Sequence, residues 1–172
     1  EASNEVNADD IMVIVGHQSA MVKAVLGSDI KYRYQKQQLG TGHAVMQALD
    51  FIGDNENILI LYGDTPLIKK ETLEKLVRIH QKERNYATVI SSFVDNPTGY
   101  GRIVRENGIF NKIVEQKDTN DKEAKINEIN TGVYIFNSNA LKTALNNLSN
   151  NNSQNEYYLT DTLELIKNTG NK

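Results

Sequence analysis

Residues 58–67 read Ile58-Leu59-Ile60-Leu61-Tyr62-Gly63-Asp64-Thr65-Pro66-Leu67. The aliphatic run that opens this stretch is too short for a helix and shows no polar alternation, so it predicts a strand buried on both faces. Tyr62 and Gly63 end the strand, and Pro66 cannot continue a central ladder. Asp64 therefore follows the carboxyl end of a core strand, which is the edge of an open α/β sheet where ligands bind.

A carboxylate at this position has two interpretations. Asp64 can hold a hard cation such as Mg²⁺ through its oxygens. It can equally begin an ordinary turn, because Asp before Thr-Pro is common in turns. This segment alone leaves both interpretations open.

The composition is that of an ordinary globular chain and limits the classes of function. The 172 residues, 39% hydrophobic and 24% charged, are enough for a single domain over 1–172. The net charge of −3 favours neither nucleic acid nor a membrane surface as a partner. The absence of cysteine excludes disulfides, thiolate zinc sites and cysteine nucleophiles, and it fits a cytoplasmic location.

In the first part of the chain, short aliphatic runs alternate with amphipathic segments. We expect strands at 11–15, 30–34, 58–61 and 87–93, and helices at 21–26, 44–52 and 73–80. The resulting order, β-α-β-α-β-α-β, favours an α/β fold with a mainly parallel sheet and helices on its faces. His80 is expected to be a half-buried residue of the third helix.

The second part of the chain has a different pattern. Asn107-Gly108 between two strand-like runs predicts an inserted β-hairpin. The charged segment 116–125 is expected to be a loop or a frayed helix. A strand is expected at 133–136, followed by Asn137-Ser138 as the N-cap of a helix. A last short helix is expected to begin near Thr160.

A glycine-rich segment, Gln38-Leu39-Gly40-Thr41-Gly42-His43-Ala44, precedes the second helix. Such a loop lets backbone N–H groups approach a phosphate or a base closely. A dinucleotide-binding fingerprint with Asp64 as its acidic residue is one interpretation. It fits poorly, because Val45 stands where the third glycine of that fingerprint belongs.

Three further positions carry polar chemistry. Gly99 and Gly101 flank Tyr100 and allow the backbone to wrap a small ligand, although a plain turn uses the same residues. Glu115 is expected at a strand end, and Asn130 just before a strand. Together, Glu115 and Asn130 offer the donors and acceptors that sugar hydroxyls and an acetamido group require.

Taken in order, these motifs resemble the uridyltransferase domain of the bacterial bifunctional N-acetylglucosamine-1-phosphate uridyltransferases. The matching segments are 39–44, 61–67, 97–103, 113–118, 130–132 and 156–161. The resemblance covers essentially the whole chain. It implies a Rossmann-like nucleotidyltransferase sheet, and a cytoplasmic enzyme that uses Mg²⁺ to make UDP-N-acetylglucosamine and pyrophosphate from UTP and N-acetylglucosamine 1-phosphate. It also implies a homo-oligomer, since the full-length parent is trimeric in this family.

The same resemblance assigns roles to individual residues. By this likeness the uracil contacts are Gln35, Gly40 and Thr41, and the floor of the site is Tyr62, Gly63 and Asp64. Asp64 would be the catalytic magnesium ligand. The residues that would hold the N-acetylglucosamine moiety are Gly101, Glu115 and Asn130, with Tyr158 and Thr160 lining the sugar-phosphate side.

The 172 residues lack several features of the resembled family. These are an N-terminal strand with a basic glycine-rich loop that grips the triphosphate, a second metal-binding Asn, and the acetyltransferase half. We therefore expect an internal fragment of the first domain with little catalytic activity. Two alternatives stay open: a uridylyltransferase for another sugar phosphate such as glucose 1-phosphate, and a non-catalytic UDP-sugar-binding module.

Overall fold

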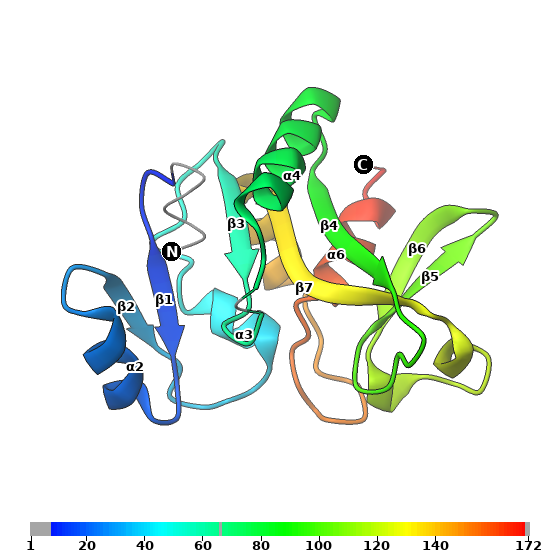
Figure 1. Cartoon of the computed structure of the whole chain (residues 1–172), viewed down its shortest axis with the longest axis horizontal. Helices are drawn as coiled ribbons and strands as arrows, with labels where there is room; N and C mark the ends of the chain where they lie inside the picture. The colour runs from blue at the N-terminus through cyan, green and yellow to red at the C-terminus, as the bar shows by residue number, and fades with distance from the viewer. Residues whose placement is uncertain (1–7, 66, 171–172) are drawn as a thin grey trace.

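The computed structural model describes residues 8–65 and 67–170, so the prediction made for Pro66 lies outside the described residues. The described strands are β1 (Met12–Val15), β2 (Lys31–Tyr34), β3 (Asn57–Leu61), β4 (Ala87–Phe93), β5 (Arg102–Glu106), β6 (Ile109–Val114) and β7 (Glu128–Asn137). The α-helices are α2 (Ser19–Leu26), α3 (Thr41–Met46), α4 (Lys70–Glu83), α5 (Ser138–Asn146) and α6 (Asp161–Asn168). The charged segment forms two short 3₁₀ turns, Gln116–Asp118 and Glu123–Lys125. The predicted alternation of strands and helices up to β4 is confirmed (Figure 1).

The prediction of one mainly parallel sheet is wrong. Among the described residues, β1 and β2 form a separate parallel pair, and the other strands form a five-stranded sheet whose pairs are all antiparallel. The reason is β7, which enters between β3 and β4 and runs opposite to both. β3 and β4 still point the same way, as expected for strands joined through a helix. An aliphatic run that is buried on both faces does not show which strands lie beside it or in which direction they run. The sequence pattern therefore could not reveal that β7 lies between β3 and β4.

The inserted hairpin is confirmed. β5 and β6 pair antiparallel up to Glu106 and Ile109. Between them, Asn107 and Gly108 have φ values of 51° and 79°. Two consecutive positive φ values are the mark of a two-residue type I′ turn, whose twist matches that of the strands it joins.

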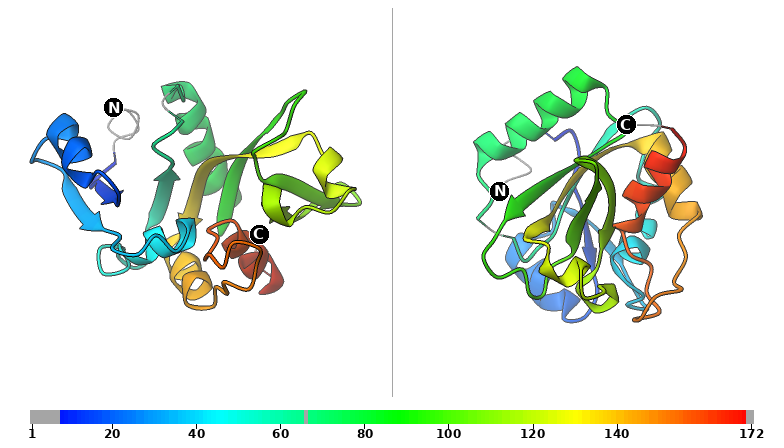
Figure 2. Two further views of the ribbon diagram at one scale, coloured as in Figure 1. Left: turned by 90° about the horizontal axis from the view of Figure 1, so that it is seen from below. Right: turned by 90° about the vertical axis from the view of Figure 1, so that its right-hand side faces the viewer.

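β7 forms the centre of the hydrophobic core. Tyr134 and Phe136 point to one face of the sheet and Val133 and Ile135 to the other, and all four are at most 2% exposed. One face packs against α5 and α6, and the other packs against α4 through Leu73 and its neighbours (Figure 2). In the described parts of the chain, no helix has the length and apolar character that crossing a bilayer requires.

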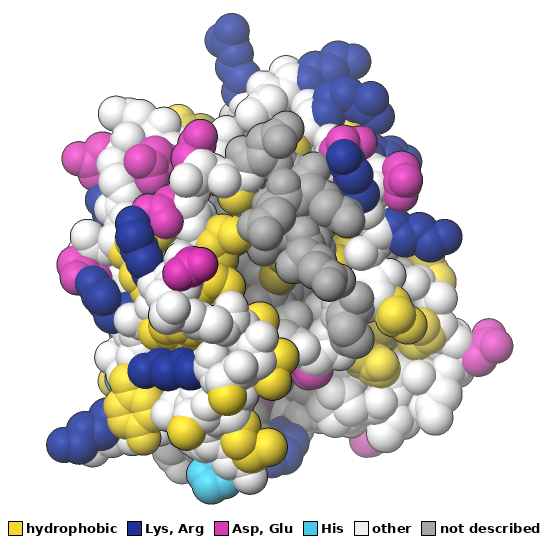
Figure 3. Space-filling view, turned by 60° about the vertical axis from the view of Figure 1, so that its left-hand side comes forward, with side chains coloured by type: hydrophobic (Ala, Val, Ile, Leu, Met, Phe, Trp, Pro, Cys, Tyr) yellow, Lys and Arg dark blue, Asp and Glu magenta, His cyan; other side chains and the backbone are white. Residues whose placement is uncertain are grey.

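Two helix predictions had different outcomes. Asn137 is the N-cap of α5, as predicted, and its side-chain oxygen accepts hydrogen bonds from the backbone N–H groups of Asn139 and Ala140. α2 also forms at the predicted place, but none of its residues is buried. Met21 and Val25 are 65% and 83% exposed. The view that brings this side of the molecule forward shows hydrophobic side chains at the surface (Figure 3).

β7 is longer than predicted and bends at Gly132. The strand was expected only at 133–136, but it begins at Glu128. Gly132 has φ 78°, and a Cβ atom there would lie 2.7 Å from the ring of Tyr62. Before the bend β7 pairs with the end of β4 and with β5, and after it with β3 and the start of β4. One strand therefore joins the main sheet to the hairpin.

We predict that Gly132→Ala destabilises the chain more than Gly108→Ala. Both residues have a left-handed backbone, which costs a residue with a Cβ about 1–2 kcal/mol. Only Gly132 also faces the Tyr62 ring, whereas a Cβ at Gly108 would meet nothing within 4 Å. Overpacking at Gly132 should add on the order of 1–3 kcal/mol. Urea denaturation of the two variants measures the difference, and equal losses would contradict a tight contact at the bend.

Candidate functional site

The candidate site lies at the edge of the sheet where β3 ends (Figure 1). Tyr62, Gly63 and Asp64 directly follow β3, as the sequence predicted. Gly63 and Asp64 are exposed, while Tyr62 is half-buried. The short helix α3 begins at Thr41, whose side chain is close enough to Tyr62 to affect the pKa of that tyrosine. The glycine-rich segment and the end of β3 are thus brought together.

The glycine-rich segment is held on two sides. The side chain of Gln35 donates to the carbonyl of Gly40 at 3.0 Å, and its amide also lies 3.0 Å from Nδ1 of His43. On the other side, the N–H of Gly42 donates to the carbonyl of Tyr157 at 2.8 Å. Gln35 therefore stabilises the conformation of the glycine-rich segment, independently of any contact with a ligand.

The residues predicted for the sugar also converge. The backbone N–H of Asn130 donates to the carbonyl of Gly101 at 2.9 Å. Thr160 donates its hydroxyl to Glu115 at 2.8 Å. A Cβ placed on Gly101 would lie 3.3 Å from the other carboxyl oxygen of Glu115. Four segments that are far apart in the chain thus meet at one place.

Asn130 connects this group to the end of β3. Its side-chain N–H donates to the hydroxyl of Tyr134 at 2.5 Å. The ring of Tyr134 in turn lies beside that of Tyr62, with centroids 5.9 Å apart. The prediction that Asn130 precedes a strand is wrong, because it lies inside β7 before the bend at Gly132. At that position Asn130 is buried, and its backbone is hydrogen-bonded to Gly101 in the cluster.

The site is acidic and partly desolvated. Burial raises the pKa of the Glu115 carboxyl, and the charges of Asp118 and Glu156 act in the same direction. Burial, followed by the charges of Glu115, Glu164 and Asp118, raises the pKa of Asp161 to about 6, although Lys112 opposes this. Asp161 is the first residue of α6, where the helix dipole favours a negative charge. Desolvation and the neighbouring acids outweigh that preference.

Sequence reasoning did not identify Arg102, which is 1% exposed. Its guanidinium donates to the carbonyl of Tyr100 and, at 2.8 Å, to the side-chain oxygen of Gln116. That same oxygen accepts the N–H of Gly99 at 2.9 Å. Arg102 therefore ties the loop before β5 to the residue after Glu115. Its position directly after Gly99-Tyr100-Gly101 could have drawn attention to it, but the sequence did not show that Arg102 is buried.

Asp64 stands at the rim of the cluster rather than inside it. No group of three or more His, Cys, Asp or Glu residues suited to a metal ion occurs in 8–65 or 67–170. The side chain of Asp64 is exposed, and a Cβ on the neighbouring Gly63 would meet nothing within 4 Å. This arrangement fits a cation whose remaining ligands come from water and substrate phosphates, which is how Mg²⁺ is commonly held.

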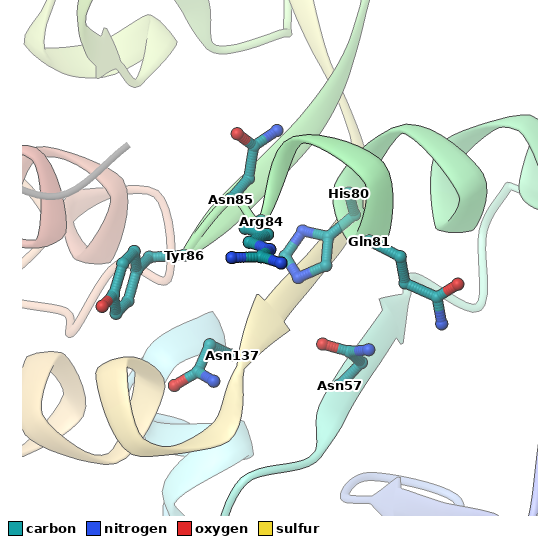
Figure 4. A pocket seen from close by; sticks show the side chains of 7 residues that line it. All are labelled: Asn57, His80, Gln81, Arg84, Asn85, Tyr86 and Asn137. Atoms are coloured by element: carbon teal, nitrogen blue, oxygen red, sulfur yellow. The ribbon is translucent and has the colours of Figure 1, made fainter.

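A separate hollow of about 350 Å³ lies at the other end of β3 (Figure 4). Its lining residues are Asn57, His80, Gln81, Arg84, Asn85, Tyr86 and Asn137. His80 was predicted to be half-buried, but it is fully buried. Its Nδ1 lies 2.9 Å from the hydroxyl of Thr88, and burial lowers the pKa of its imidazole. These contacts support a structural role for His80.

The fold is that of a nucleotidyltransferase type of domain. A family model described as "Nucleotidyl transferase" matches residues 1–172, and the chain belongs to this family. It is 51% identical over its full length to the "Bifunctional protein GlmU" of Caldanaerobacter subterraneus, and 49% identical to that of Clostridioides difficile. In both cases the chain spans only 38% of the relative's length.

Solved structures with the same fold are more distant in sequence. A UDP-glucose pyrophosphorylase complexed with UDP-glucose superposes with a TM-score of 0.74 at 20% identity, covering 99% of this chain and 74% of that one. A putative glucose-1-phosphate thymidylyltransferase from Bacillus anthracis gives 0.77 at 22% identity, covering 98% and 68%. These likenesses confirm the α/β nucleotidyltransferase fold that the sequence predicted.

We predict that Asp161→Asn stabilises the chain near neutral pH and not under acidic conditions. The folded-state pKa of Asp161 is raised from 3.8 to about 6. The folded state therefore binds more protons in that window, and the stability tied to protonated Asp161 is lost as the pH rises through 6. A shift of about two units corresponds to about 3 kcal/mol, which solvent screening reduces to on the order of 1–2 kcal/mol.

Urea denaturation at about pH 4 and about pH 8 measures this difference, since the two values bracket the titration of Asp161. Asp121→Asn, which removes an exposed carboxylate from the charged segment, is the control. A gain in stability that is the same at both pH values would contradict the raised pKa.

Proposed function

We propose that this chain forms the substrate-binding part of an enzyme that makes UDP-N-acetylglucosamine and pyrophosphate from UTP and N-acetylglucosamine 1-phosphate. One observation carries the proposal: Thr41, Tyr62, Glu115 and Asn130 meet in one cluster at the carboxyl end of β3. The identity of about half of the residues to proteins named GlmU supports the same substrates. The cytoplasmic location, the homo-oligomeric state and the low activity of the isolated chain remain predictions.

The two sides of the cluster have different tasks in this proposal. Gln35, Gly40 and Thr41 contact the uracil, while Gly101, Glu115 and Asn130 hold the N-acetylglucosamine moiety. The contacts of Glu115 support its role, because Thr160 donates to one carboxyl oxygen and leaves the other to accept from sugar hydroxyls. The amide of Asn130 has one further N–H and one further lone pair for the same sugar.

The reaction needs no protein nucleophile. A phosphate oxygen of N-acetylglucosamine 1-phosphate attacks the α-phosphorus of UTP in line, and the bond to the β-phosphate breaks as pyrophosphate leaves. The residues of this chain contribute by holding the two substrates in that alignment. The half-buried Tyr62 between the two sides excludes water from part of the contact.

Asp64 is the residue that we propose as a ligand of Mg²⁺, on the basis of its exposure and of its position just after β3. When bound, such an ion neutralises charge on the substrate phosphates. Asp64 would hold it at the rim of the site, just after the end of β3.

Calorimetry combined with a pyrophosphate-release assay tests the proposal. We expect this chain to bind UDP-N-acetylglucosamine at least about tenfold more tightly than UDP-glucose, a difference of about 1.4 kcal/mol. Preference for UDP-glucose would favour an enzyme for glucose 1-phosphate. Binding of UDP-N-acetylglucosamine without turnover, even in the full-length protein, would favour a non-catalytic module.

We predict that Glu115→Gln weakens the binding of N-acetylglucosamine 1-phosphate without weakening that of UDP. The substitution keeps the size of the side chain but replaces one of its two acceptor oxygens by a donor, which leaves a sugar hydroxyl unpaired. The loss should be about 1–3 kcal/mol. Calorimetry with each ligand measures it, and Glu106→Gln on the exposed turn side of the hairpin is the control. Equal losses for both ligands would indicate that Glu115 only supports the fold.

We also predict that Asp64→Asn removes the effect of Mg²⁺ on UTP binding. In the native chain, Mg²⁺ should tighten UTP binding, and the neutral amide should lower that gain about tenfold or more. Because Asp64 is exposed, the melting temperature should stay unchanged. Calorimetry with and without Mg²⁺ measures the effect, with Asp29→Asn, a distant exposed site, as the control. An unchanged Mg²⁺ dependence would refute the metal role.

A further inference from the structure

Tyr134 places a buried hydroxyl in the middle of the candidate site. Its side chain is 0% exposed. The ring lies between Tyr62 and Phe136, with centroid distances of 5.9 and 5.8 Å. Packing explains the ring, but a phenylalanine would provide the same ring. The hydroxyl needs a separate explanation, because a buried polar group is costly unless it is hydrogen-bonded.

The hydroxyl of Tyr134 helps to set the orientation of the Asn130 amide. The N–H of Gly132 donates to the side-chain oxygen of Asn130 at 3.2 Å, and a backbone N–H can only donate. The oxygen of the amide must therefore face Gly132, and its nitrogen must face Tyr134, to which it donates at 2.5 Å. Tyr134 is therefore the acceptor that faces the nitrogen of this amide.

The glycine-rich segment lies beside the same pair of tyrosines. The hydroxyl of Thr41 accepts the backbone N–H of Leu159 at 3.0 Å, and its side chain is close enough to Tyr62 to affect the pKa of that tyrosine. Burial raises the pKa of Tyr134 well above its ordinary value, so its hydroxyl keeps its proton at physiological pH.

We propose that Tyr134 is a positioning residue whose hydroxyl accepts a hydrogen bond from Asn130 and so holds the Asn130 amide in the orientation that receives the sugar. This inference rests on the proposed function, since it takes Asn130 as a sugar contact. Phenylalanine at position 134 would keep the packing but would leave an N–H of Asn130 without its buried partner. The amide would then rotate more freely, and the sugar would lose a fixed donor.

The test compares Tyr134→Phe with Tyr32→Phe. The hydroxyl of Tyr32 donates to the carbonyl of Gly27 at 2.7 Å, so this control also removes one hydrogen bond, away from the site. By calorimetry, Tyr134→Phe should weaken UDP-N-acetylglucosamine about tenfold and change UDP by less than about twofold. Tyr32→Phe should change neither. Equal weakening of both ligands by Tyr134→Phe would overturn the proposal.

A double-mutant cycle separates positioning from general support. If Tyr134 acts through Asn130, then Tyr134→Phe should have no further effect on sugar-nucleotide affinity in an Asn130→Ala background. The same loss in both backgrounds would refute the positioning role and leave the proposed function intact.

Nuclear magnetic resonance of the ligand-free chain provides an independent measurement. In Tyr134→Phe the side-chain N–H signals of Asn130 should shift, and in Tyr32→Phe they should not. Unchanged signals in Tyr134→Phe would refute the link itself. Failure of the native chain to bind UDP-N-acetylglucosamine, with the Asn130 signals shifting as expected, would instead refute the proposed function and with it the role of the link in sugar binding.

Discussion

The contact on which the rest of the site depends is the packing of the Tyr62 ring against the bend of β7 at Gly132. The bend has φ 78°, and a Cβ there would lie 2.7 Å from the ring. Because β7 bends at this point, one of its halves pairs with β3 and the other reaches β5. The hairpin with Gly101 and Glu115 is thereby held beside the end of β3. Through this bend, a single strand brings Gly101 close to the residues that follow β3.

Polar groups in this cluster are satisfied mostly by one another, and the arrangement favours uncharged parts of a ligand. Burial raises the pKa values of Glu115, Tyr62 and Tyr134, and that of Asp161 reaches about 6. Such a desolvated, acidic environment suits hydroxyl and amide groups and repels phosphates. The exposed Asp64 lies outside it, at the rim, where a cation can compensate for the charge of phosphates. In the proposed function, sugar recognition is thus separated from the handling of charge.

Much of the secondary structure was predictable because its causes are local. The hairpin turn followed from Asn107-Gly108, whose positive φ values few other residue pairs tolerate. The start of α5 followed from Asn137, which caps the helix with its own side chain. The candidate residues around Gly40, Tyr62, Glu115 and Asn130 were identified from motifs. Their convergence into one cluster was not visible in any single motif, because each is compatible with an ordinary turn.

By itself, the sequence determined the order of most strands and helices, the hairpin turn, and that the chain has the α/β nucleotidyltransferase fold. The tertiary structure alone decided that β7 lies between β3 and β4, and that Asn130 sits inside a bent strand. It also decided that Arg102 and Tyr134 are buried and that Asp161 is desolvated. The physical reason is the range of the interactions. Capping and turn geometry act within a few residues, whereas strand neighbours, burial and pKa values depend on groups that meet only after the chain has folded.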